Sequence, residues 1–181
     1  MNNILDRNSH KDEIQEFIEL KGESKLNEFV EILKTNNELC SWKYVLDLYR
    51  YDKRLLINIF KYLSFFEEFL ISQLKLENYK KCKMSMKSIM EEIINNKTII
   101  EYNDFDNIFF KNNYEALNKL RNNVCHNKII INVTYKNQNI NKILEIFKNI
   151  LPQNYRKGFV SDINKCKKGL NLPDSLVVKI I

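Results

Sequence analysis

Glycine and proline are scarce in this chain, with three glycines and two prolines among 181 residues. Both residues interrupt helices and build tight turns, so a chain with so few of them is poorly suited to an all-β sandwich. The three glycines are also isolated from one another, which excludes a glycine-rich phosphate-binding loop. This scarcity therefore favours long helices.

Histidine and closely spaced cysteines are also missing. The two histidines, His10 and His126, are too few for an ordinary histidine-based metal site, and no H-E-x-x-H motif occurs. The cysteines form no C-x-x-C pair and lack zinc-ligand spacing. We expect no metal and no other cofactor. We also expect free thiols in a reducing cytosol at all four cysteines, Cys40, Cys82, Cys125 and Cys166.

No uninterrupted apolar run is long enough to span a membrane. The most apolar stretch, Ile57 to Leu76, contains Lys61, Glu67 and Glu68, so it is predicted to be a core helix. The first twelve residues are polar and do not resemble a signal peptide. These features predict a cytoplasmic protein without a membrane partner.

The composition is that of a globular chain with a sizeable core, 44% hydrophobic and 29% charged. No Gly/Ser-rich linker divides it. We expect an N-terminal helical segment over residues 1–40 and a helical bundle over residues 41–181, together forming one compact domain. The formal charge of +6 suits a polyanionic partner such as RNA, but an ordinary lysine-rich surface would give the same balance.

Apolar residues recur at intervals of three and four, which predicts an all-α fold. Ser24, Ser41 and either Asp104 or Asp106 are candidate helix caps. The β-branched run Ile129–Tyr135 predicts one short strand or an extended connector. Helices are expected near residues 9–22, 24–36, 41–79, 84–95, 107–125, 140–151 and 152–168.

The residues best suited to chemistry are Arg121 and His126, at the end of the helix expected over residues 107–125. An imidazole can give or take a proton near neutral pH without a metal. A guanidinium can hold a phosphate through two hydrogen bonds and stabilise a pentacoordinate transition state. Five residues on a helix turn through about 140° and rise about 7.5 Å, so the two side chains would flank a groove. Asn122 shares the face of His126 and could orient the ring or the phosphate.

Other interpretations remain open. On spacing alone, Arg121 could pair at a helix end and His126 could be an ordinary terminal residue. A Cys125–His126 nucleophile is disfavoured, because adjacent helical residues diverge by about 100°. Arg50 and Arg54 share a helix face and could contact phosphate, but on these residues alone surface pairing with Asp47 and Asp52 is the favoured explanation.

Two sequence words resemble the HEPN superfamily, and most closely its Abi-like (abortive infection) proteins. The first is Leu120-Arg121-Asn122-x3-His126-Asn127, which is similar to the family's R-N-x3-H signature at the end of a helix. The second is the segment 46–55, LDLYRYDKRL, followed by the apolar helix 59–74, which resembles the family's Leu-Tyr-x-Phe-Asp-Arg-x-Leu segment. The resemblance extends from about Ser41 to the end of the chain.

The resemblance implies a HEPN-type helical bundle and a homodimer whose two motifs form one composite active site. It also implies a metal-independent endoribonuclease, a hydrolase acting as a toxin or in anti-phage defence, with an antitoxin or a regulatory RNA as a further partner. Carried over by position, Arg121 and His126 become the catalytic pair and Asn122 a polar support. The expected RNA contacts are Arg50, Arg54, Lys119, Asn127 and Lys128.

The chain departs from the family in two ways. It lacks the family's N-terminal aromatic word, and Lys128 stands where related toxins carry a tyrosine that can be modified. The alternative function is a non-catalytic HEPN-like module that binds RNA or protein. A third interpretation is a helical interaction protein in which Arg121 and His126 are structural.

Overall fold

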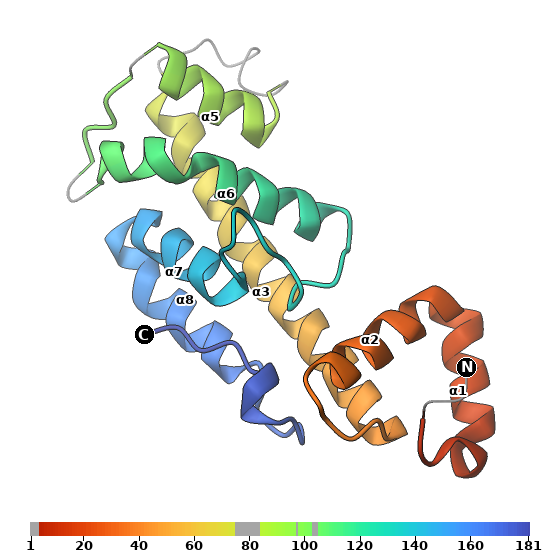
Figure 1. Ribbon diagram of the computed structural model, residues 1–181. Coiled ribbons are helices and arrows are strands. Elements are labelled where there is room, and N and C mark those ends of the chain that lie inside the picture. The colour runs from red at the N-terminus through yellow and green to blue at the C-terminus, as the bar shows by residue number, and fades with distance from the viewer. Residues whose placement is uncertain (1–3, 75–83, 97, 103–104) are drawn as a thin grey trace. The chain divides into compact units, whose positions relative to one another are not determined.

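The computed structural model describes residues 4–74, 84–96, 98–102 and 105–181, and within them the fold is all-α (Figure 1). The described residues contain no β-strand, and a single bridge joins Tyr135 to Gln138. The all-α prediction is therefore confirmed. The elements are η1 (Arg7–His10), α1 (Lys11–Lys21), α2 (Glu23–Thr35), α3 (Trp42–Gln73), α5 (Met86–Asn95), α6 (Asn107–Cys125), α7 (Ile140–Ile150), α8 (Gln153–Lys165) and η2 (Asp174–Leu176).

The chain groups into two compact units. The first consists of Met1–Arg54 and Lys165–Val177, and the second of Leu55–Asn164 and Val178–Ile181. The boundary falls within α3, so the first turns of this helix belong to the first unit and the remaining turns to the second. The expected N-terminal segment, residues 1–40, lies wholly within the first unit.

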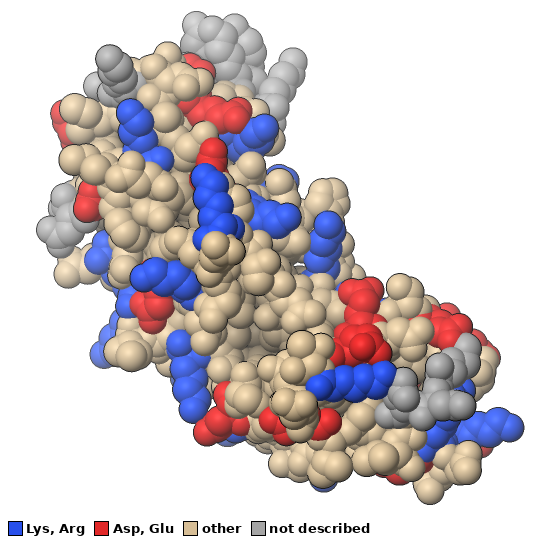
Figure 2. All heavy atoms as spheres, viewed as in Figure 1, with Lys and Arg blue, Asp and Glu red and all other residues tan. Residues whose placement is uncertain are grey.

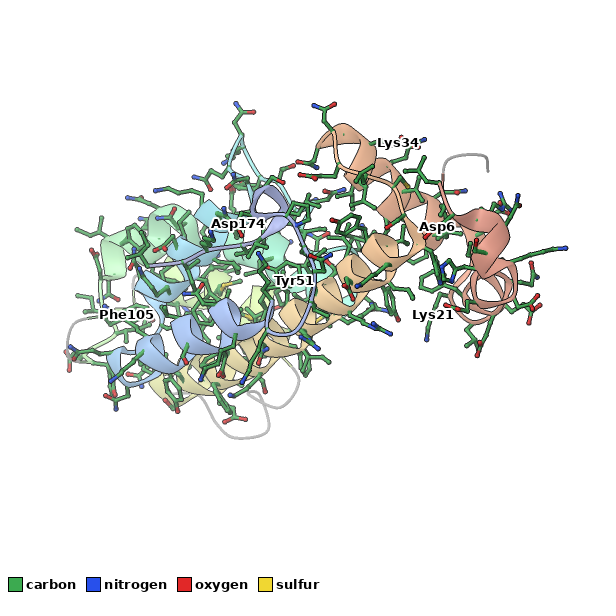
Figure 3. All side chains as sticks on the ribbon, turned by 90° about the horizontal axis from the view of Figure 1, so that it is seen from below. Asp6, Lys21, Lys34, Tyr51, Phe105 and Asp174 are labelled. Carbon is green, nitrogen blue, oxygen red and sulfur yellow. The ribbon has the colours of Figure 1, made fainter. Side chains whose placement is uncertain are left out.

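Aromatic side chains form the core of the first unit. The ring of Phe17 makes edge contacts with Trp42 and Tyr49, at centroid distances of 5.7 and 5.2 Å. The indole N–H of Trp42 donates to Glu13, and its backbone N–H donates to Asp6, labelled in Figure 3, both at 2.8 Å. These contacts fix the start of α3 against η1 and α1.

Two helix boundaries in this unit follow the predicted signals, and a third does not. Gly22 has a φ of 89°, which favours glycine, and it separates α1 from α2 as expected. Ser41 accepts the backbone N–H of Tyr44 at 3.3 Å and caps α3. The prediction that Ser24 caps α2 is wrong, because α2 begins at Glu23 and Gly22 occupies the cap position without a side-chain bond.

The core of the second unit is built on one face of α3. The predicted apolar face is confirmed, since every member is at most 4% exposed: Leu55, Ile59, Leu63, Phe66, Leu70 and Leu74. Phe66 contacts Phe110 of α6 and Phe147 of α7, at centroid distances of 6.2 and 5.9 Å. The expected extension of this helix to about Tyr79 lies outside the described residues.

Three shorter helices, α5, α6 and α7, contribute to this core. All four predicted inward residues of α5 are buried, namely Met86, Ile89, Met90 and Ile93, and α5 packs on α6. Helix α6 spans the residues predicted for it, with Asp106 accepting the backbone N–H of Phe109 at 2.8 Å as its cap. Helix α7 packs along α6 through an apolar face (Figure 1).

The segment between α6 and α7 is a connector and not a strand. Ile129, Ile130 and Val133 are buried, so the β-branched residues serve as core side chains of a turn-rich loop. The apolar C-terminal residues dock on the body, since Ile180 and Asn164 exchange two hydrogen bonds of 2.8 and 3.2 Å. Among the described residues, none of the helices has the length and apolar character needed to cross a membrane.

A close helix contact involves Tyr62 of α3 and Gly158 of α8. Tyr62 is buried, and its hydroxyl donates to Asp162 at 2.9 Å. A Cβ on Gly158 would lie 2.8 Å from that hydroxyl oxygen and 3.9 Å from the ring carbon that bears it. Because the ring of Tyr62 also packs on Phe159 at 5.1 Å, it has little room to retreat.

We predict that Gly158→Ala destabilises the protein by about 1–2 kcal/mol, since overpacking commonly costs about 1–3 kcal/mol and outweighs the gain in helix propensity. In a Tyr62→Phe background the clashing oxygen is absent. There the same substitution should stabilise by up to about 1 kcal/mol. Urea unfolding of the four proteins in a double-mutant cycle measures both values. Equal effects of Gly158→Ala in the two backgrounds would contradict this contact.

Candidate functional site

Helix α6 presents the candidate catalytic residues. Its buried side, which includes Phe110, Leu117 and Leu120, packs into the core of the second unit. Arg121 lies at the border of that side and is half-buried, whereas His126 is exposed. The two side chains therefore leave the helix in different directions, as their five-residue separation predicts.

The chain leaves the helix immediately at His126. The backbone N–H of His126 donates to the backbone oxygen of Asn122 at 3.0 Å. His126 is the last residue before the chain turns. Asn127 has a φ of 52°. Its backbone N–H donates to the backbone oxygen of Val124 at 3.0 Å, and the backbone N–H of Lys128 donates to the backbone oxygen of Asn123 at 2.9 Å. This pair of bonds is a Schellman motif, which satisfies the last helical carbonyls. It fixes the position of His126 at the helix end.

The side chains of Arg121, Asn122 and His126 are not committed to structural bonds. Across the described ranges of the chain, none of the three side chains forms a hydrogen bond or ion pair. The Nε atom of Arg121 is buried and lacks an acceptor. A buried donor without an acceptor costs free energy, so the Arg121 side chain would gain by turning outward to meet an oxyanion.

The neighbouring asparagine has a different role. Asn123 is buried, and its side-chain amide donates to the backbone oxygen of Lys119 at 2.7 Å. It therefore helps to build the last turns of α6. Asn122 lies one residue earlier and is partly exposed on the side of His126, as the helical spacing predicts.

The exposed side of α6 is basic. Lys119 and Lys128 are exposed, and Figure 2 shows basic side chains gathered around the C-terminal end of α6. Glu115 is the only acidic residue of α6. It accepts hydrogen bonds from Lys136, at 2.7 Å, and from Tyr135. These bonds hold the pKa of Glu115 below its ordinary value and raise the pKa of Lys136, so the carboxylate is neutralised by a neighbouring cation.

The two upstream arginines make structural bonds in the first unit. Arg54 donates to the backbone oxygens of Cys166 and Lys168, at 3.1 and 2.7 Å. Arg50 lies 3.4 Å from Asp47, which also accepts the backbone N–H of Asn171. The predicted pairing of Arg50 with Asp47 is therefore confirmed, although only the arginine is exposed and Asp47 is buried. Contacts of Arg50 and Arg54 with RNA stay a prediction.

The described residues offer no group of three or more His, Cys, Asp and Glu side chains that could hold a metal ion. Cys40, Cys125 and Cys166 are free thiols, and Cys82 lies outside the described residues. Burial raises the pKa of the Cys40 thiol, which favours its neutral form.

Sequence reasoning missed two features of this region. Asn127 was assigned to RNA, yet it also provides the left-handed residue that ends α6. An asparagine directly after a predicted helix is a recognised signal for that role. The cluster of Glu115, Tyr135 and Lys136 joins residues about twenty positions apart, and no local pattern reveals it.

Comparison of the chain with protein-family models, curated proteins and solved structures found no match. The HEPN resemblance therefore remains a prediction from the two sequence words.

The left-handed conformation of Asn127 gives a stability prediction. Asn127→Ala should destabilise the protein by about 1 kcal/mol, because most residues with a Cβ pay about 1–2 kcal/mol in this conformation. Asn127→Gly should be more stable than Asn127→Ala, since glycine adopts positive φ freely. Thermal unfolding of the two variants measures the difference. If the alanine variant matches the glycine variant, the backbone explanation is wrong. The glycine variant, which keeps the fold and removes the amide, also tests whether Asn127 contacts RNA.

Proposed function

We propose that this chain is a HEPN-type, metal-independent endoribonuclease that acts as a toxin or anti-phage effector. One observation carries the proposal. A half-buried arginine whose Nε lacks an acceptor and an exposed, uncommitted imidazole stand at the end of the same helix, on a basic surface. A phosphodiester supplies both the missing acceptor and the negative charge that such a surface attracts.

The proposed reaction is an internal transfer of the RNA phosphate. The ribose 2′-oxygen forms a bond to the adjacent phosphorus and gives its proton to a base. The bond to the 5′-oxygen breaks, and that oxygen takes a proton from an acid. The products are a 2′,3′-cyclic phosphate and a 5′-hydroxyl, so DNA, which lacks the 2′-hydroxyl, is not cleaved.

Each residue has a distinct proposed role. His126 moves a proton to or from the reacting oxygens. Arg121 holds the nonbridging phosphate oxygens and stabilises the charge that develops in the transition state. Asn122, on the side of His126, orients the ring or the phosphate. Lys119 and Lys128 hold the adjacent backbone phosphates.

A second copy of the chain would supply a second imidazole. Acid and base roles in one turnover are most simply filled by two such groups, and each chain has only one other histidine. His10 lies in the first unit, where its ring is 3.6 Å from Asp6 and 3.2 Å from Glu13. We therefore include in the proposal a composite site formed by two copies of Arg121 and His126 around one RNA strand, whose phosphates offset the repulsion between the basic faces.

The second candidate function is RNA binding without cleavage. The single imidazole at the candidate site of each chain favours it, because one copy alone offers only one proton-transfer group there. In that case RNA affinity would fall steeply with salt concentration, and no product would form.

The first prediction from this proposal concerns RNA cleavage in the presence of EDTA. Wild type should produce cyclic-phosphate ends, and Arg121→Ala and His126→Ala should each lower the rate by about 10²–10⁴-fold. Arg121→Lys is the matched control for charge, and it should recover only part of the rate because lysine lacks the planar two-donor fork. Circular dichroism checks that each variant is folded.

Two results would count against the ribonuclease proposal. Activity that survives His126→Ala would exclude His126 as the proton-transfer group. A folded wild type that binds RNA tightly at low salt, yet leaves it intact, would support the binding module instead.

The second prediction concerns the composite site. The Arg121→Ala and His126→Ala variants are each inactive alone, but a mixture that has exchanged subunits should regain part of the wild-type rate. One cleft of such a mixed pair contains one intact arginine and one intact histidine, so the phosphate contact and one of the two proton-transfer groups are restored and the recovery is incomplete. If each copy carries a complete site by itself, the mixture will stay as inactive as its components.

A further inference from the structure

Helix α3 exposes two large apolar side chains in the second unit. Ile57 is 64% exposed and Phe60 is 53% exposed. They lie on the side of α3 opposite its buried residues, such as Ile59 and Phe66. Their exposure means that no other described residue covers these two side chains.

These two residues belong to a longer strip centred on Ser64. At 100° per residue, Ile57 and Ile71 lie within about 20° of Ser64, and Phe60 and Glu68 within about 40°. From Ile57 to Ile71 the strip is about 21 Å long. Ser64 and Ile71 are partly exposed, and Glu68 is exposed. We call these five residues the α3 strip.

The charged residues along one edge of the α3 strip can pair with the same residues of a second copy. Lys61 and Glu68 lie on the same edge of the strip, about 60° and 40° from Ser64, on either side of its midpoint. If a second α3 packs antiparallel with its midpoint at Ser64, Lys61 of each copy faces Glu68 of the other. Ile57 then faces Ile71, Phe60 covers the other edge, and the small Ser64 lets the two helices approach.

A parallel two-fold arrangement is less favourable, because it brings opposite edges of the strip together. Glu68 of each copy would then face Glu67 of the other, which lies about 60° from Ser64 on the opposite edge, while Lys61 would face Phe60 and lose its acidic partner. Like charges at close range are unfavourable. Lys61 already donates to Asp162 at 2.8 Å, yet it remains 47% exposed and its ammonium has further donors. The charges therefore select the antiparallel pairing.

We propose that the α3 strip binds a second copy of this chain through an antiparallel, two-fold contact centred on Ser64. One helix pair of this length buries less surface than a permanent dimer needs, so the association is reversible and depends on concentration. The contact lies on the side of α3 away from Phe66, which touches α6. It therefore does not join two copies of His126, and it does not rest on the ribonuclease proposal.

Cysteine crosslinking tests the contact at its midpoint. In a background with Cys82→Ser and Cys125→Ser, the cysteines that remain, Cys40 and Cys166, are buried. Ser64→Cys should form a disulfide-linked dimer under mild oxidation, because the two Ser64 positions meet at the two-fold axis. Ser72→Cys is the matched control. It is an exposed serine on the same helix, about 80° from the strip midpoint, and it should stay largely monomeric.

Sedimentation velocity tests the surface without crosslinks. Wild type should show a reversible monomer–dimer equilibrium, and Ile57→Glu should weaken it roughly tenfold or more. Ile108→Glu is the control, since Ile108 is 76% exposed but lies on α6, and it should leave the equilibrium unchanged. Glu68→Lys should weaken the dimer because it places two lysines together.

The proposal is overturned by a wild type that remains monomeric up to about 1 mM. The proposal is also overturned if the Ile57→Glu variant dimerises as strongly as wild type and the Ser64→Cys and Ser72→Cys variants form disulfide-linked dimers in equal yield. RNA cleavage by the same samples reports separately on the candidate site, so failure of one proposal is distinguishable from failure of the other.

Discussion

The packing of Phe66 against Phe110 and Phe147 is the contact on which the second unit depends. It joins α3 to α6 and α7 with centroid distances of 6.2 and 5.9 Å, and Phe147 extends the contact to Phe159 of α8 at 5.3 Å. Aromatic pairs of this geometry add to the free energy gained by burying the rings themselves. Because α6 is held on its buried side by this cluster, its other side is free to carry polar groups. The direction of Arg121 and His126 therefore follows from an aromatic core three turns away.

The end of α6 shows how stability and function can place different demands on adjacent residues. Asn123, Asn127 and the backbone of Lys128 complete the last turn, and their hydrogen bonds are satisfied within the chain. Arg121, Asn122 and His126 make no such side-chain bonds within the described residues. A helix that needed all of its polar side chains for its own cap would leave none for a ligand. Here the cap is built by the backbone and by the asparagines, so the arginine and the imidazole are available for chemistry.

Local sequence signals predicted most of the helices, because spacing and capping act over a few residues. The buried face of α3 and the Asp106 cap of α6 follow directly from periodicity and from residue type. Contacts between distant residues could not be predicted in this way. Arg54 looked like a phosphate ligand, yet it donates to carbonyl oxygens 112 and 114 residues later in the chain. Ser24 was expected to cap α2, but the conformational freedom of Gly22 already ends α1 and starts the next helix.

The two exposed surfaces of the second unit differ in chemistry, and that difference separates their proposed partners. The exposed side of α6 carries Lys119 and Lys128, and its single acid is neutralised by Lys136. Such a surface repels another copy of itself at low ionic strength and attracts a polyanion. The exposed side of α3 carries isoleucine and phenylalanine, together with a lysine and a glutamate on either side of the strip midpoint. This side therefore attracts RNA only weakly, but it is complementary to a second α3. If both proposals hold, RNA and the second copy bind through different helices of the same core. Occupation of one surface then leaves the other accessible, and a composite site would require a contact in addition to the α3 strip.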